Sequence, residues 1–116
     1  MPFMRVKTNQ EMATSEAETG FLQEASAKVA ELLNKPERYC MVALEPGELM
    51  FFAGADTPCA HVELASLELP EEETQEYSQA LCDFLQAKLD VEPERIYIRF
   101  EDVERGMWGT NRTTFG

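Results

Sequence analysis

The sequence predicts a single α+β domain of the α/β two-layer kind, in which two βαβ repeats form a four-stranded mixed sheet with two helices on one face. One supporting observation is the order of hydrophobic patterns along the 116 residues: strand, helix, strand, strand, helix, strand. Another is that Pro-Glu-Arg occurs at 36–38 and again at 93–95, each time between a helix pattern and an apolar strand pattern. The two copies lie about half a chain apart, which predicts pseudo-repeats of approximately residues 1–58 and 59–116.

The first βα pair is predicted from two hydrophobic periods. Residues Phe3–Thr8 alternate apolar and polar side chains, and this period of two predicts a strand. Ser15 followed three residues later by Glu18 is typical of a capping box at the start of a helix. Apolar residues then recur at helical spacing and predict an amphipathic helix over 17–33, with Asn34 as its end.

The middle of the chain is predicted to form a turn, a buried strand and a hairpin partner. Residues 35–38 are a turn, and Tyr39–Glu45 is apolar enough for a strand that is buried on both faces. Pro46 and Gly47 favour a tight turn. The apolar run Leu49–Ala53 then predicts a short strand or hairpin partner, followed by a loop over 54–60.

The second half repeats this order. Residues His61–Leu69 predict a strand whose alternation slips near Ala65, which indicates a bulge. Pro70 and the three glutamates after it favour the start of a second helix. Ile96, Ile98 and Phe100 lie on one side of the next predicted strand, and a short terminal strand or loop ends the chain.

The predicted layers leave one face of the sheet without a cover. With both helices on one face, we expect the other face to be apolar and bare, and the pattern contains no third helix to cover it. The simplest cover is other copies of the same chain, so the sequence predicts self-association.

Charge and cysteine content exclude some classes of partner. Lys and Arg total 10 against 22 Asp and Glu, a formal net charge of −12, which argues against binding nucleic acid or anionic membranes. The three cysteines form no C-x-x-C pair, which favours reduced thiols. No apolar run has the length of a membrane span or the form of a signal peptide, so we expect a cytoplasmic location.

Pro2 is the first candidate for chemistry. In one interpretation it is only the first residue of a strand, where a missing N–H is tolerated. In the other, removal of the start methionine exposes a secondary amine. An α-amine titrates near pH 8, against about 10.4 for lysine, and burial or a nearby cation lowers its pKa further. Such an amine can move a proton at a carbon next to a carbonyl.

Six segments, in order and with matching spacing, resemble the tautomerase superfamily, and within it the macrophage migration inhibitory factor family. They are "MPFMRVKTN", "NKPERY", "GADTPCA", "YSQALCDFLQAKL", "ERIYIRFED" and "TNRTTFG". The resemblance covers essentially the whole chain. It implies a homotrimer with sites at the subunit interfaces. It also implies cofactor-free keto–enol tautomerisation of phenylpyruvate- or dopachrome-type compounds, with Pro2 as base and then acid.

The resemblance also implies the residues that surround the proline. Lys35 matches the family's site lysine, which would hold a substrate carboxylate, although a lysine at a helix end also suits the helix dipole. Tyr39 and Tyr97 match two site aromatics, with Tyr97 expected from a neighbouring subunit. Leu67 replaces a common isoleucine in the apolar wall, and Phe115 matches a phenylalanine at the rim. Each of the aromatic residues could instead be ordinary packing.

The chain departs from the family pattern at three places. Arg99 stands where an asparagine is usual, and it could grip a carboxylate or crowd the pocket. Trp108 takes a usual valine position and Thr110 a usual tryptophan position, which suggests that the rim aromatic has moved to Trp108. Val62 replaces the second cysteine of a C-x-x-C, so we expect no dithiol redox activity, and a lone His61 predicts no metal site.

Two functions are therefore predicted, with a third kept open. The first is a tautomerase that needs no cofactor and acts on a small aromatic keto or enol acid. The alternative is a cytokine-like signalling or interaction protein, with a receptor partner, export without a signal peptide and vestigial catalysis. A trimeric scaffold without a site is the third.

Overall fold

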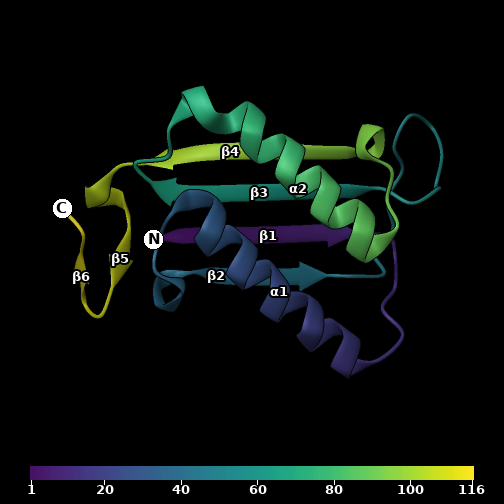
Figure 1. Cartoon of the computed structure of the whole chain (residues 1–116), viewed down its shortest axis with the longest axis horizontal. Helices are drawn as coiled ribbons and strands as arrows, with labels where there is room; N and C mark the ends of the chain where they lie inside the picture. The colour runs from purple at the N-terminus through teal and green to yellow at the C-terminus, as the bar shows by residue number, and fades with distance from the viewer.

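The computed structural model describes residues 1–116 and confirms the predicted two-layer fold (Figure 1). The strands are β1 (Pro2–Thr8), β2 (Met41–Glu45), β3 (Ala60–Leu67) and β4 (Ile96–Val103). Helices α1 (Ser15–Leu33) and α2 (Thr74–Leu89) cross one face of their sheet, which has the strand order β2-β1-β3-β4. Strands β1 and β2 are parallel, β3 and β4 are parallel, and the central pair β1 and β3 is antiparallel, which gives the two predicted βαβ units.

The hydrophobic core lies between the helices and the sheet. Burial alternates strictly along β1, and Met4 and Val6 are fully buried because every second side chain points at the helices. Val62 and Leu64 of β3 are buried beneath the helices in the same way. The helices contribute residues spaced three and four apart, which form one apolar stripe on each. These are Phe21, Ala25, Val29 and Leu33 of α1 and Tyr77, Leu81, Phe84, Leu85 and Leu89 of α2.

The ends of α1 are set by local chemistry, with one shift from the prediction. The hydroxyl of Thr14 accepts a hydrogen bond from the amide of Ala17 at 3.0 Å, so Thr14 caps the helix and the prediction of Ser15 was wrong by one residue. Asn34 ends the helix as expected, in the left-handed conformation with φ of 54°.

Both Pro-Glu-Arg segments lead through a 3₁₀ turn into a strand. The turns span Glu37–Tyr39 and Pro93–Arg95. Tyr39 therefore belongs to a turn, and β2 begins at Met41 rather than at Tyr39. The repeated tripeptide marks the same junction in the two units.

Two predictions about the segments around β3 were wrong. Residues 49–53 form no strand, and only an isolated bridge joins Phe52 to Ala55 because the chain turns tightly at Ala53 and Gly54, which both have positive φ. Strand β3 has no bulge, since Ala65 pairs with Phe3 and Glu101 in unbroken register.

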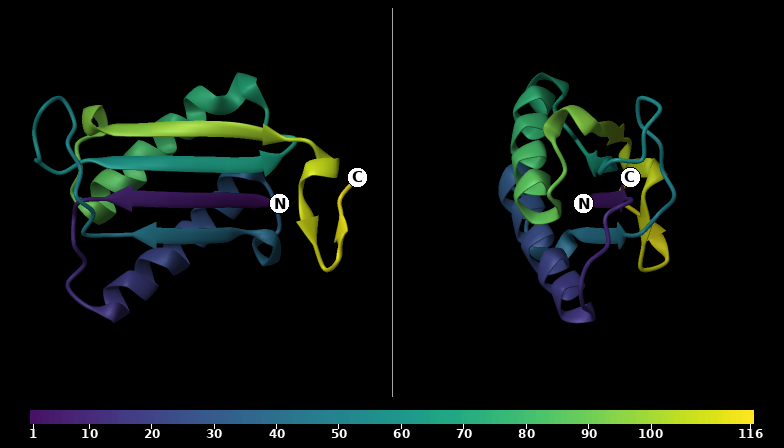
Figure 2. Two further views of the ribbon diagram at one scale, coloured as in Figure 1. Left: turned by 180° about the vertical axis from the view of Figure 1, so that it is seen from behind. Right: turned by 90° about the vertical axis from the view of Figure 1, so that its right-hand side faces the viewer.

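The open face of the sheet is charged, so the prediction of an apolar bare face was also wrong. Figure 2 shows this face free of helices. Arg5 pairs with Glu63 and Glu45, Lys7 pairs with Glu45, and Arg99 pairs with Glu63. The same alternation that directs apolar side chains to the helices directs these ions to the opposite face.

Strand β2 forms an edge of the sheet. Its residues are partly exposed, and Met41 is 65% exposed. The two-sided burial predicted for Tyr39–Glu45 is therefore absent from the single chain. Beyond β4, the strands β5 (Gly109–Thr110) and β6 (Thr113–Thr114) form a small hairpin beside the N-terminus (Figure 1). None of the helices combines the length and apolar character needed to cross a bilayer.

Candidate active site at the start of the central strand

A cavity of about 450 Å³ opens at the end of the sheet where β1 begins. Four residues predicted for the site line it: Pro2, Tyr39, Trp108 and Phe115. They come from the start of β1, the turn before β2 and the C-terminal hairpin. The fold thus brings together parts of the chain that are far apart in sequence.

Pro2 is held rigidly at the end of the chain. Its side chain is fully buried, and it pairs with Ser66 of β3 while the next residue, Phe3, pairs with Met41 of β2. With Met1 in place the nitrogen of Pro2 is an amide, and the amine belongs to Met1. Burial, followed by the positive charge of Lys35, lowers the pKa of that amine below its usual value of 8.0.

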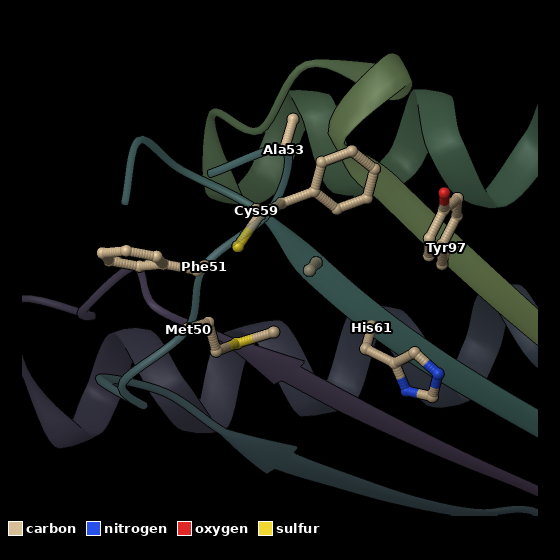
Figure 3. A pocket seen from close by; sticks show the side chains of 8 residues that line it. Met50, Phe51, Ala53, Cys59, His61 and Tyr97 are labelled. Carbon is tan, nitrogen blue, oxygen red and sulfur yellow. The ribbon is translucent and has the colours of Figure 1, made fainter. Parts of the chain in front are cut away.

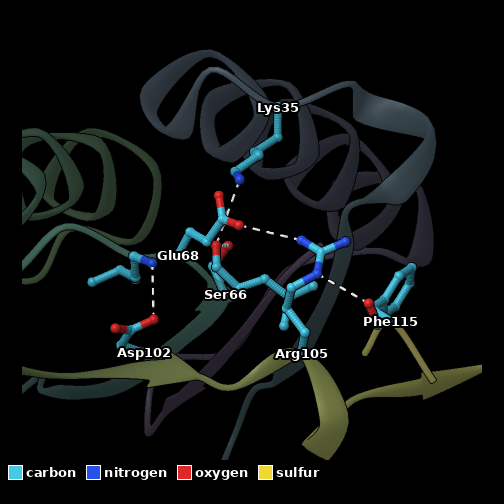
Figure 4. Close-up of polar contacts among 8 residues, drawn as sticks. Lys35, Ser66, Glu68, Asp102, Arg105 and Phe115 are labelled. Atoms are coloured by element: carbon cyan, nitrogen blue, oxygen red, sulfur yellow. Dashed lines mark hydrogen bonds and ion pairs between the residues drawn. The ribbon is translucent and has the colours of Figure 1, made fainter.

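Lys35 lies beside the cavity and outside its wall. Its ammonium donates a hydrogen bond to the carbonyl of Leu67 at 3.5 Å, and it lies near Glu68 and Arg105 (Figure 4). Leu67 is buried at the end of β3, and its carbonyl also accepts from the hydroxyl of Ser66 at 3.1 Å. The carbonyl of Leu67 is therefore already bound to two donors of the same chain.

Arg105 ties the C-terminal hairpin to the end of β3. Its Nε donates to the carbonyl of Phe115 at 3.0 Å, and its Nη1 lies 3.2 Å from a carboxylate oxygen of Glu68 (Figure 4). The positive charge of Arg105 also lowers the pKa of the Met1 amine, after the effects of burial and Lys35. The sequence carried no pattern that pointed to this arginine.

Arg38 is a further wall residue that the sequence reasoning missed. Its guanidinium lies 4.6 Å from the centre of the Tyr39 ring, and its Nη2 donates to the Tyr39 hydroxyl at 3.4 Å. The signal that pointed to it was its place three residues after Lys35 in a turn already predicted to border the site.

Tyr97 and Arg99 lie far from Pro2 within one chain. Pro2 pairs with Ser66, whereas Tyr97 pairs with His61 and Arg99 with Glu63, five and three residues back along β3. At about 3.3 Å per residue these offsets are roughly 16 Å and 10 Å. The single chain therefore does not bring these two side chains to the proline.

Tyr97 instead borders a second hollow of about 400 Å³ at the opposite end of the sheet (Figure 3). The segment from Met50 to Ala53 forms its other wall, and the rings of Phe52 and Tyr97 lie 4.8 Å apart between centroids. No three His, Cys, Asp or Glu side chains converge as metal ligands would, and all three cysteines are free thiols.

The chain is similar to known proteins over its whole length. The family model described as macrophage migration inhibitory factor (MIF) matches residues 1–116. Macrophage migration inhibitory factor of Mus musculus is 34% identical over 116 residues, which cover 99% of both chains. D-dopachrome decarboxylase of Gallus gallus is 32% identical and covers 97% of this chain and 96% of its own. The solved structure of a homologue from Prochlorococcus marinus has a TM-score of 0.89 at 40% identity, covering 98% of this chain and 99% of that one.

Proposed function

This chain belongs to the macrophage migration inhibitory factor family, and from that premise we propose that it is a cofactor-free keto–enol tautomerase for small aromatic keto acids. Phenylpyruvate and dopachrome-type compounds are the test substrates. The observation that carries the proposal is the position of Pro2, which starts the central strand, is fully buried and lines the cavity. A relative named D-dopachrome decarboxylase, similar over nearly the whole chain, supports this substrate class.

The proposed base is the secondary amine that removal of Met1 would leave on Pro2. It inherits the surroundings that already lower the pKa of the Met1 amine: burial, Lys35 and Arg105. A low pKa keeps the amine neutral near pH 7, so that it can accept a proton.

The chemistry is one proton moved between two atoms of the substrate. The nitrogen of Pro2 takes a proton from the carbon next to the keto group, which leaves an enolate and a prolinium ion. The prolinium then returns that proton to the enolate oxygen, and the reverse path gives the ketone. Lys35 is proposed to offset the negative charge of the carboxylate and the enolate, and an apolar wall that includes Trp108 and Phe115 keeps water away.

We also propose that the active form is a homotrimer. The 16 Å offset between Pro2 and Tyr97 means that a complete site needs Tyr97 and Arg99 from a neighbouring copy. Exposed apolar residues, with Leu49 at 102% and Phe51 at 77%, supply surface for such a contact. Native mass measurement should give about three times 13.2 kDa, and a monomer in dilute solution would contradict this assembly.

Phenylpyruvate ketonisation tests the proposed chemistry. The N-terminal mass should first confirm that Met1 is absent, and the rate should then exceed that of buffer. Pro2→Gly keeps a free amine but not a secondary one, and we expect a loss of about 10²-fold or more in kcat/KM. An N-terminal extension that keeps the Pro2 nitrogen as an amide should abolish the rate. Equal activity in Pro2→Gly would exclude Pro2 as the base.

An interaction role is the second candidate, because the mouse relative is named for an effect on macrophage migration. Binding of the unsubstituted protein and of Pro2→Gly to a candidate receptor would test it. If Pro2→Gly abolishes catalysis and leaves binding intact, the two functions use different surfaces.

A further inference from the structure

We propose that Arg38 makes this cavity selective for keto acids that carry a second negative charge, with dicarboxylates as the favoured substrates. The inference rests on the proposed tautomerase function and specifies its substrate class. It comes from the pairing of charges in the chain, from the contacts of Arg38 and from its place in the cavity wall.

Most cations of this acidic chain are already neutralised. Six of the ten Lys and Arg side chains form salt bridges with carboxylates: Arg5, Lys7, Lys28, Lys88, Arg99 and Arg105. Arg95 has no carboxylate partner, but it donates to four backbone carbonyls. The cations without a salt bridge or several backbone acceptors are Lys35, which has one carbonyl partner, Arg38 and Arg112, although the chain has 22 acidic residues.

Two of the remaining cations flank Pro2. Lys35 lies on one side, where its charge acts on the N-terminal amine, and Arg38 lies in the cavity wall. Neither forms a salt bridge, although Glu68 lies near Lys35 and the net charge is −12. That field repels a dianion, so selection of one requires local positive charge at the site.

The contacts of Arg38 hold it in place and leave it free to bind. Its guanidinium rests on the Tyr39 ring, which restricts its position at 4.6 Å from the ring centre. One of its five N–H groups has a protein acceptor, the Tyr39 hydroxyl at 3.4 Å. The free donors match the geometry of a carboxylate, which an arginine binds through two parallel hydrogen bonds.

A substrate with one carboxylate would use only one of these cations. If Lys35 holds the carboxylate attached to the keto carbon, the remaining part of the substrate extends toward the wall formed by Tyr39 and Arg38. A second carboxylate there would meet the free guanidinium, whereas an unsubstituted ring would leave that charge without a partner. The arrangement therefore favours the dianion.

A matched pair of substrates tests this inference: phenylpyruvate and the same compound with a carboxylate on the ring, 4-carboxyphenylpyruvate. We expect the unsubstituted protein to favour the dicarboxylate by about tenfold in kcat/KM, because a well-placed charged pair is worth roughly that factor. Arg38→Gln should lower kcat/KM for the dicarboxylate more than for phenylpyruvate, so that the preference disappears. Arg38→Lys should retain part of the preference, because lysine keeps the positive charge but lacks the two parallel N–H donors of a guanidinium.

Lys28→Gln is the control, since it removes the same charge from a position on α1 that does not line the cavity and should leave the preference intact. An equal effect of Arg38→Gln on both substrates, or the same effect from Lys28→Gln, would overturn the inference. If the unsubstituted protein turns over neither compound, the proposed function fails. The affinities of 3-(4-carboxyphenyl)propionate and 3-phenylpropionate, measured by calorimetry for the unsubstituted protein and for Arg38→Gln, then test the role of Arg38 separately. Equal affinities in both proteins would refute it.

Discussion

Replacing Arg95 with lysine tests how the segment between β2 and β3 is held in place. That segment has no regular structure, yet the guanidinium of Arg95 donates to four of its carbonyls. The acceptors are Phe52 at 3.0 Å, Ala55 at 3.3 Å, Thr57 at 3.0 Å and Pro58 at 2.9 Å. The same guanidinium lies 5.1 Å from the centre of the Phe52 ring.

The expected loss of stability follows from the bonds that lysine cannot make. A net hydrogen bond contributes about 0.5–1.5 kcal/mol, and one from a charged donor contributes more. Arg95 is only partly buried, so we take about 1 kcal/mol for each bond. An ammonium on a single stem can keep one of the four contacts, which leaves three lost. The free energy of unfolding should fall by about 3 kcal/mol.

Urea unfolding measures this change. With a slope of about 1–3 kcal/mol per molar urea, the midpoint should fall by roughly 1–3 M. The protein concentration must be fixed, because self-association would add to the apparent stability. Arg38→Lys is the matched control, and its single side-chain hydrogen bond predicts a change below about 1 kcal/mol. A fall of less than about 0.5 kcal/mol for Arg95→Lys would refute the idea that Arg95 holds the segment between β2 and β3 in place.

Three other predictions concern the site and the core. Burial and Lys35 lower the pKa of the Met1 amine, and the amine proposed for Pro2 would lie in the same surroundings. Lys35→Gln should therefore move the rise of tautomerase activity to higher pH, and an unmoved pH–rate profile would contradict the role of the charge. Thr8→Val removes a fully buried hydroxyl that bonds two backbone groups, so urea unfolding should show a loss of about 1–3 kcal/mol, most of which Thr8→Ser should avoid. Burial and the hydrogen bond to Glu73 raise the pKa of Tyr77 to about 12, so the free energy of unfolding should fall as pH rises from about 10 toward 12. The same measurement on Tyr77→Phe should show a smaller fall over that range.

Local periodicity predicted most of the fold because each regular element carries its own pattern. The alternation in Phe3–Thr8 and the helical spacing before Asn34 survive in the structure with shifts of only a residue or two. Local periodicity fails for residues 49–53. They have the composition of a strand, but a strand needs a partner, and the chain turns away at Ala53 and Gly54 before one can pair. Composition alone does not reveal whether an apolar side chain meets a core.

The polarity of the open face was present in the sequence and was read wrongly. Arg5, Lys7, Glu63 and Arg99 occupy alternate positions of their strands, which indicates a solvated face. We instead inferred an apolar face from the absence of a third helix. The charged residues at alternate positions of each strand predict ion pairs on this face. An apolar surface for contact with other copies is then expected at the edge strand and in the loop before β3.

The site was predicted through the family resemblance more than through the residues themselves. The resemblance selected Pro2, Tyr39, Trp108 and Phe115, and the fold places all four around one cavity. The resemblance does not name Arg38, and only its place three residues after Lys35 pointed to it. That Arg38 forms no salt bridge depends on where the acidic side chains lie in space, which a linear pattern does not record.

The pairing of β1 on both sides has a consequence for the end of the chain. Chain termini usually fray, because their last residues lack neighbours and keep their conformational entropy. Here the first strand is central, so Ser66 and Met41 flank the opening residues from either side. An amine on Pro2 would thus be as fixed as a core residue, with its ordering entropy already lost when the sheet folds. A chain end placed in this way can hold a reacting atom still without any loop or lid.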